Sequence, residues 1–140
     1  MEIRREAVEK LIARAMSARE KAYAPYSRFR VGAAAMTRGG RIYTGCNVEN
    51  SSYGLTCCAE RVAVFKAVSE GDRDITDIAL ISDSKDYCSP CGACRQVLAE
   101  FGDGIRVYMC NSRGEYEVGT VGDLLPGKFS LPPGESQANE

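Results

Sequence analysis

The chain has 140 residues, enough for one domain with a sizeable core. Its 18 basic and 19 acidic residues nearly balance, so no excess of positive charge attracts nucleic acid or an anionic membrane, and a small neutral partner fits better. Seven cysteines occur without any histidine, which excludes histidine-based catalytic triads, His-rich zinc sites and haem ligation by imidazole.

The first residues, "MEIRREAVEK", carry charges where an export signal needs an apolar run. No stretch of the sequence approaches the roughly 20 apolar residues of a membrane span. We therefore expect a cytoplasmic protein that binds neither nucleic acid nor membrane. In that compartment, reduced cysteines serving as metal ligands are favoured over a disulfide framework.

The N-terminal part predicts a helix followed by a β-hairpin. Apolar residues recur at spacings of three and four from Val8 to Ala22, which indicates an amphipathic helix ended by Pro25. The stretch "FRVGAAAMTRGGRIYTGCN" then contains two strand-like runs around Gly39-Gly40, the pattern of a hairpin. The apolar side chains of its first run are small, which suggests that a helix or a ligand packs closely against it.

Helices and strands alternate in the rest of the chain. "CAERVAVFKAVS" (58–69) is apolar around most of its circumference, which predicts a central buried helix, and "CGACRQVLAEF" (91–101) predicts a shorter helix that stops at Gly102. Three runs have the pattern of strands: "ITDIALISD" (75–83), "IRVYMC" (105–110) and "EYEVG" (115–119). This alternation favours an α/β sandwich.

The chain closes with a turn of helix at "TVGDLL" (120–125) and a tail rich in proline and polar residues. With no repeat and no linker in the sequence, we expect a single catalytic domain over residues 1–130. We expect a flexible C-terminal tail over residues 131–140.

Cysteines gather at the starts of the two later helices. Cys91 and Cys94 are three residues apart directly after Pro90, a metal-ligand spacing that on its own is as compatible with a redox pair. The pair Cys57-Cys58 precedes the other helix, beside Glu60. Two helix N-termini that face each other favour the negative charge of thiolates.

A carboxylate close to three sulfurs is the arrangement of a catalytic zinc site. Cys58 and Glu60, two residues apart, diverge in mid-helix but can share a site in a first helical turn. A structural zinc site would use a fourth protein ligand, whereas a catalytic site keeps one position open for water. Arg61 and Arg95 are either donors to the sulfurs, offsetting their charge, or ordinary surface arginines.

Five motifs in register carry a resemblance to a known family. "AYAPYSRFRVGAA", "GCNVENSSYGL", "CAER", "PCGACRQ" and "LLPGKF" occur in the order and at the spacings of the zinc-dependent cytidine deaminases, in the small form with three cysteine ligands. The resemblance implies a three-layer α-β-α sandwich with a mixed five-stranded sheet. It also implies hydrolytic deamination of cytidine and deoxycytidine to uridine and deoxyuridine, with release of ammonia, in pyrimidine salvage.

The resemblance implies the roles of the metal-site residues. Cys58, Cys91 and Cys94 would hold one Zn²⁺ per chain, and Glu60 would shuttle protons while zinc-activated hydroxide attacks C4 of the base. Cys57 would then be a small half-buried residue, a choice that geometry alone leaves open. The other three cysteines would fill core or loop space; they are Cys46, Cys88 and Cys110.

The resemblance also implies a set of substrate-binding residues. Asn47 and Glu49 would hold the ribose hydroxyls, Phe29 would stack near the base, and the backbone of Ala59 would meet the base edge. Ser51, where many relatives have alanine, lies in a loop with largely main-chain contacts. The family's small enzymes are homotetramers that share active sites, so Tyr53 and Phe129 would reach into neighbouring subunits. Without the resemblance, "NVEN" also suits a turn and Phe29 also suits core packing.

Two other functions stay open at this point. A blasticidin S deaminase would use the same zinc chemistry on a larger, cationic nucleoside, although its members generally lack the full "CNVENSSYG" stretch. A non-catalytic structural zinc module is the second alternative, against which Glu60 argues, because such a site has no use for that acid. Glu49 disfavours phosphates nearby, and no glycine-rich phosphate loop or basic cluster offsets its charge, so a free nucleoside is the expected substrate.

Overall fold

A computed structural model describes residues 5–134. Its centre is a five-stranded sheet with the order β2-β1-β3-β4-β5. The strands are β1 (Val31–Thr37), β2 (Ile42–Cys46), β3 (Ile75–Ser82), β4 (Arg106–Cys110) and β5 (Tyr116–Thr120). β3 and β4 pair in parallel and the other neighbours pair antiparallel, which confirms the expected mixed sheet.

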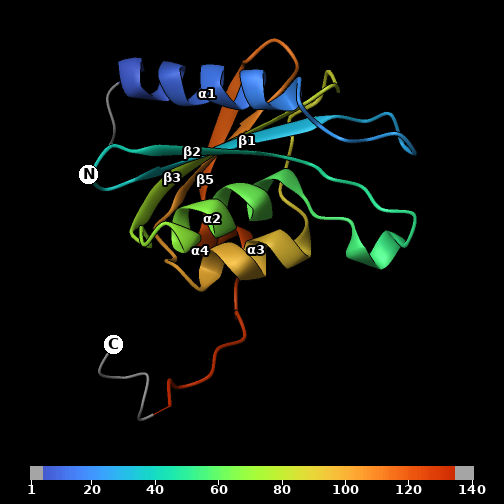
Figure 1. Cartoon of the computed structure of the whole chain (residues 1–140). Helices are drawn as coiled ribbons and strands as arrows, with labels where there is room; N and C mark the ends of the chain where they lie inside the picture. The colour runs from blue at the N-terminus through green and yellow to red at the C-terminus, as the bar shows by residue number, and fades with distance from the viewer. Residues whose placement is uncertain (1–4, 135–140) are drawn as a thin grey trace.

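Helices cover both faces of the sheet (Figure 1). One face carries α1 (Arg5–Arg19), and the other carries α2 (Ala59–Ser69), α3 (Gly92–Ala99) and the short α4 (Val121–Leu124). The expected three-layer α-β-α sandwich is therefore confirmed. No helix within residues 5–134 is long and apolar enough to cross a membrane.

Alternation along the strands divides the core between the two faces. In β1, Ala33 and Ala35 belong to the cluster under α2 and α3, whereas Ala34 and Met36 belong to the cluster under α1. β3 repeats this pattern with Ile78 and Leu80 on one side and Ala79 and Ile81 on the other. The central strands are thus buried on both faces.

Two glycines allow the helices to approach the sheet closely. A Cβ atom on Gly32 would meet the carbonyl oxygen of Ala15 in α1, and one on Gly45 would meet the carbonyl oxygen of Ala59 in α2. Small side chains in β1 therefore reflect close helix packing, as the sequence suggested. Because Ala59 opens α2, the contact at Gly45 fixes where that helix begins.

Two expectations about helices differ from the structure. α1 ends at Arg19 rather than near Pro25, because Tyr23 donates a backbone hydrogen bond to Asn47 and accepts one from Glu49, which draws the chain toward the hairpin. α2 was expected to be a central buried helix, but one side of it faces solvent, since Phe65 is 49% exposed.

The C-terminal segment leaves the body of the protein beyond α4 (Figure 1). Residues 131–134 contain no helix or strand and are exposed. The remainder of the expected tail, residues 135–140, lies outside the described residues. The flexibility of the tail and the limits of the single domain stay predictions.

We predict that Gly45→Ala destabilises the protein. The new Cβ would lie 2.5 Å from the backbone nitrogen of Ala63 and still closer to Ala59, so α2 must shift, which costs about 1–3 kcal/mol of unfolding free energy. Gly39→Ala is the control, because nothing lies within 4 Å of a Cβ there. Denaturant unfolding measures both variants, and equal midpoints would contradict the close approach.

Candidate active site

Three sulfur atoms converge at one point of the structure. The sulfurs of Cys58, Cys91 and Cys94 all lie within 4.8 Å of one another, with 3.9 Å between Cys58 and Cys91 and 3.2 Å between Cys91 and Cys94. Zn–S bonds of about 2.3 Å at tetrahedral angles place sulfurs roughly 3.8 Å apart. This three-sulfur cluster therefore fits one zinc ion.

The cluster forms because two of its members begin helices. Cys58 is the N-cap of α2 and Cys91 is the N-cap of α3, where its sulfur accepts the backbone N–H of Cys94 at 3.4 Å. First-turn N–H groups have no partner within a helix, and the positive end of the helix dipole lies there. Both helices thus present favourable charge to the sulfurs, as the sequence predicted.

The surroundings distinguish Cys58 from its neighbour Cys57. Hydrogen bonds from Cys94 and Arg61 lower the pKa of the Cys58 thiol to about 5. Burial instead raises the pKa of Cys57, whose backbone exchanges two hydrogen bonds with Val48. Cys57 is not among the three clustered sulfurs. The geometry therefore selects Cys58, a choice that the cysteine spacing alone could not make.

Glu60 lies in the first turn of α2 and is only 5% exposed. It lines a hollow of about 230 Å³ together with Cys58 and Cys91. Burial raises the pKa of its carboxyl group. A carboxyl group at this position can accept a proton and return it, which is the requirement for a general acid–base.

The two residues expected at the base, Phe29 and Ala59, line the same hollow, and Phe29 is 43% exposed. Asn47, expected at the ribose hydroxyls, is also in its wall. Sequence reasoning missed four further lining residues: Val31, Thr56, Cys88 and Ser89. Of these, Val31 belongs to the quoted "RFRVGAA" motif and Ser89 adjoins "PCGAC", so motif membership was the available signal.

A second hollow, of about 360 Å³, adjoins the first and shares Thr56 with it. Glu49 and Tyr53 line this hollow, and Tyr53 is 80% exposed. The remaining lining residues are Tyr26, Ser27 and Asn50. The structure therefore separates the expected base-contacting residues from Glu49, with Asn47 in the first hollow.

Asn47 and Glu49 already hold the loop that carries Phe29. The carboxylate of Glu49 accepts the backbone N–H groups of Tyr26 and Ser27, at 3.0 and 3.2 Å, and the Ser27 hydroxyl. These hydrogen bonds, that of the Ser27 side chain above all, lower the pKa of Glu49. Asn47 donates to the Phe29 carbonyl oxygen at 2.8 Å. Both residues are thus oriented before any ligand binds.

Ser51 and Phe129 have different surroundings. The Ser51 hydroxyl lies 2.6 Å from the hydroxyl of Tyr26, on the rim of the second hollow. Phe129 is 69% exposed, and its carbonyl oxygen accepts a hydrogen bond from Gln96 on α3. The hollow that Phe129 lines contains none of the three sulfurs. Within one chain, Phe129 is therefore not brought to the candidate site.

The two arginines differ in what they contact. Arg61 donates to the sulfur of Cys58 at 3.3 Å, and this hydrogen bond raises the pKa of its guanidinium. Arg95 instead donates to the carbonyl oxygens of Pro90 and Leu124 and to the Ser89 hydroxyl. The interpretation of Arg95 as a sulfur donor is therefore not supported by these contacts. The Arg95 side chain instead connects the start of α3 to the end of α4.

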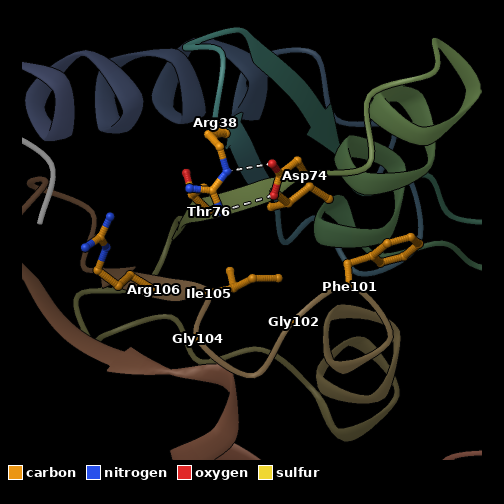
Figure 2. A pocket seen from close by; sticks show the side chains of 9 residues that line it. Arg38, Asp74, Thr76, Phe101, Gly102, Gly104, Ile105 and Arg106 are labelled. Carbon is orange, nitrogen blue, oxygen red and sulfur yellow. Dashed lines mark hydrogen bonds and ion pairs between the residues drawn. The ribbon is translucent and has the colours of Figure 1, made fainter. Parts of the chain in front are cut away.

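A separate hollow lies at the opposite end of β3 (Figure 2). Its volume is about 290 Å³, and its charged groups Arg38 and Asp74 form an ion pair with 2.6 Å between Nε and Oδ2. Arg106, also in its wall, donates to Asp77 at 2.7 Å. Neither Glu60 nor the three-sulfur cluster lines this hollow, so it is not a candidate catalytic centre.

A family model described as the cytidine and deoxycytidylate deaminase zinc-binding region matches residues 5–110. The chain belongs to this family. The match contains all three clustered sulfurs and Glu60. Zinc is therefore the cofactor of the chain, in agreement with the sequence prediction.

Known members of the cytidine deaminase family resemble the chain over most of its length. The cytidine deaminase of Sporosarcina psychrophila is 56% identical over 124 residues, which cover 88% of this chain and 91% of that protein. The probable cytidine deaminase of Dictyostelium discoideum is 52% identical over 126 residues, which cover 89% of this chain and 85% of that protein. The crystal structure of cytidine deaminase from Burkholderia pseudomallei has a TM-score of 0.84 at 49% identity, covering 86% of this chain and 98% of that one.

We predict that zinc is lost on substituting any member of the three-sulfur cluster by serine and kept in Cys57→Ser, because only the cluster converges on the helix starts. Metal analysis of the purified variants measures this. Cys57→Ser is the matched control, since it alters the adjacent thiol on the same segment. Loss of zinc there, with retention in Cys58→Ser, would move the ligand by one residue.

Proposed function

We propose that the chain is a zinc-dependent cytidine deaminase, which hydrolyses cytidine and deoxycytidine to uridine and deoxyuridine and releases ammonia. The observation that carries the proposal is a buried carboxyl group, Glu60, in the wall of a hollow that is also lined by two of the three converging cysteines, Cys58 and Cys91. The identity to known cytidine deaminases supports the choice of substrate.

Cys58, Cys91 and Cys94 would hold the zinc ion and leave its fourth position open toward the hollow. When bound, zinc supplies the Lewis acid that makes water a nucleophile at neutral pH. Arg61 donates to Cys58 and so offsets part of the negative charge that three thiolates bring together.

Glu60 would move the protons of the reaction. It accepts one from the attacking water as the new C–O bond forms at C4 of the pyrimidine, and delivers it to N3. It then transfers the second proton of that water to the amino group, and the C–N bond breaks to release ammonia. Water supplies the oxygen of the product, so the atoms balance without another reactant.

The two adjoining hollows suit the two parts of a nucleoside. Phe29 and the backbone of Ala59 would face the base, and Asn47 and Glu49 would hold the sugar hydroxyls, Asn47 from the first hollow and Glu49 from the second. The ionised carboxylate of Glu49 disfavours a phosphate next to the sugar. We therefore infer a free nucleoside as substrate. Salvage of pyrimidines in the cytoplasm is the role that we propose for such an enzyme, in line with its resemblance to cytidine deaminases.

Neither alternative function is favoured by the comparisons, since the relatives that match over most of the chain are cytidine deaminases. One experiment tests the assignment directly. Purified protein is incubated with cytidine, deoxycytidine, CMP or blasticidin S while loss of the cytosine absorbance is followed. We expect turnover of the two nucleosides, and a response to CMP or blasticidin S alone would overturn the proposal.

We predict that Glu60→Gln lowers the turnover of cytidine by about 10²–10⁴, because the amide keeps the shape of the side chain but cannot carry a proton. Its zinc content should equal that of the parent, since Glu60 is not a member of the cluster. Steady-state kinetics and metal analysis of the same sample check both statements. Turnover within tenfold of the parent would remove Glu60 from the mechanism.

We further infer a homotetramer with shared active sites. Tyr53 and Phe129 are 80% and 69% exposed, and Phe65 on the outer side of α2 is 49% exposed. Exposed aromatic side chains of this size are typical of surfaces that bind another protein subunit. Phe129 would complete the site of a neighbouring subunit, because it lies away from the hollow of its own chain. Tyr53 lines the second hollow of its own chain and, highly exposed there, would also reach a neighbouring site.

We predict that Phe129→Ala weakens cytidine binding by about 1–3 kcal/mol, the loss expected for a buried aromatic anchor, while zinc content is unchanged. Leu131→Ala is the control, because it removes a side chain of similar exposure from the same segment and should leave affinity unaltered. Substrate titration measures the affinity of each variant, and light scattering measures the oligomeric state. A fully active monomer, or equal affinities of both variants, would show that each chain builds its site alone.

A further inference from the structure

The loop formed by residues 24–30 carries Phe29 to the wall of the first hollow. Within the loop, the Arg28 N–H donates to the Ala24 carbonyl oxygen at 2.9 Å and the Phe29 N–H donates to the Ser27 hydroxyl at 3.0 Å, and residues outside the loop supply further hydrogen bonds. Arg28 has φ 58°, in the left-handed region that non-glycine residues rarely occupy. Such backbone persists only where the surroundings determine it. The hydrogen bonds that Glu49 and Asn47 provide are two of these determinants.

Asp83 provides a third determinant of the loop conformation. The peptide that joins Phe29 to Arg30 is held at both ends: Asn47 donates to its carbonyl oxygen at 2.8 Å, and its N–H donates to Oδ2 of Asp83 at 3.0 Å. The guanidinium of Arg30 donates to both carboxylate oxygens of Asp83, each at 3.1 Å. These hydrogen bonds, that of the Arg30 side chain above all, lower the pKa of Asp83.

Asp83 is itself firmly placed. It directly follows β3, and its backbone N–H donates to the carbonyl oxygen of Arg30 at 3.2 Å. Glu20 adds a second carboxylate to Arg30 at 3.1 Å. The carboxylate of Asp83 therefore connects a rigid strand end to the peptide immediately after Phe29.

We infer that Asp83 is a positioning residue for the nucleoside: with Arg30 it fixes the peptide that orients Phe29, and so determines substrate affinity. The inference rests on the proposed function, because Phe29 is placed against the base there. Asp83 does not line either hollow of the site and touches no reacting group.

The same two strands supply an internal control. Arg38 directly follows β1 and pairs with Asp74, which precedes β3, at 2.6 Å (Figure 2). This pair closes the far end of the β1–β3 ladder as Arg30–Asp83 closes the near end. At about 3.3 Å per residue, the eight residues of β3 separate the two ends by roughly 25 Å. A purely structural role predicts similar effects of the two pairs, whereas a positioning role predicts an effect on binding from Asp83 alone.

The kinetic experiment compares Asp83→Ala, Asp83→Asn and Asp74→Ala, all loaded with zinc. We expect Asp83→Ala to raise KM for cytidine about tenfold, which corresponds to about 1.4 kcal/mol, with kcat within about twofold of the parent. Asp83→Asn keeps an acceptor for the Arg30 N–H and should recover part of that loss. Asp74→Ala should leave KM unchanged, and thermal unfolding of each variant shows how far stability alone changes.

A second measurement does not depend on turnover. The chain has seven tyrosines but no tryptophan, so Phe29→Trp introduces into the loop a single tryptophan that can be excited selectively at wavelengths where tyrosine does not absorb. Adding Asp83→Ala to Phe29→Trp should lower the emission anisotropy, and adding Asp74→Ala should not. Unchanged KM in Asp83→Ala, or equal anisotropy in the two double variants, would overturn the inference. Absence of cytidine turnover in the parent would instead reject the proposed function. The anisotropy measurement would then still test whether Asp83 fixes the loop that carries Phe29.

Discussion

The convergence of three sulfurs on the starts of two helices is the constraint on which the rest of the structure depends. Thiolates gathered at one point repel one another, so they need fixed positive groups nearby. The first turns of α2 and α3 and the guanidinium of Arg61 supply these groups. The close approach of α2 to Gly45 and the hydrogen bonds of Arg95 then determine where the two helices begin.

The residues proposed to bind the nucleoside are organised differently, because most of them lie in loops rather than at helix starts. The loop with Phe29 has a left-handed residue, and besides its internal hydrogen bonds it is held by Asn47, Glu49 and Asp83, which follow β2 or β3. Side chains at strand ends therefore impose order on a segment that has no regular structure. This arrangement combines a precise position for an aromatic ring with exposure to an incoming ligand.

Local sequence patterns predicted the parts of the structure that short-range physics controls. Short apolar runs between turn residues predicted the strands, and the position of Cys91 and Cys94 directly after Pro90 predicted that they lie at a helix start. Contacts between distant residues could not be obtained this way. Arg95 meets Leu124, 29 residues away, and Arg30 meets Asp83, 53 residues away. The early end of α1 at Arg19 has the same cause, since the bridge from Tyr23 to Val48 competes with helix continuation.

The hydrogen bonds of Glu49 have a thermodynamic consequence. An ionised carboxylate offers about four acceptor sites, and the loop around Ser27 occupies three of them with donors. In the proposed complex a sugar hydroxyl therefore takes the remaining site or displaces a loop donor. Loop order and ligand occupancy are then linked, and by reciprocity each changes the free energy of the other. In the proposed complex, a substitution at Glu49 would remove a ligand contact and a loop anchor together, so its measured binding loss combines two coupled effects that do not simply add.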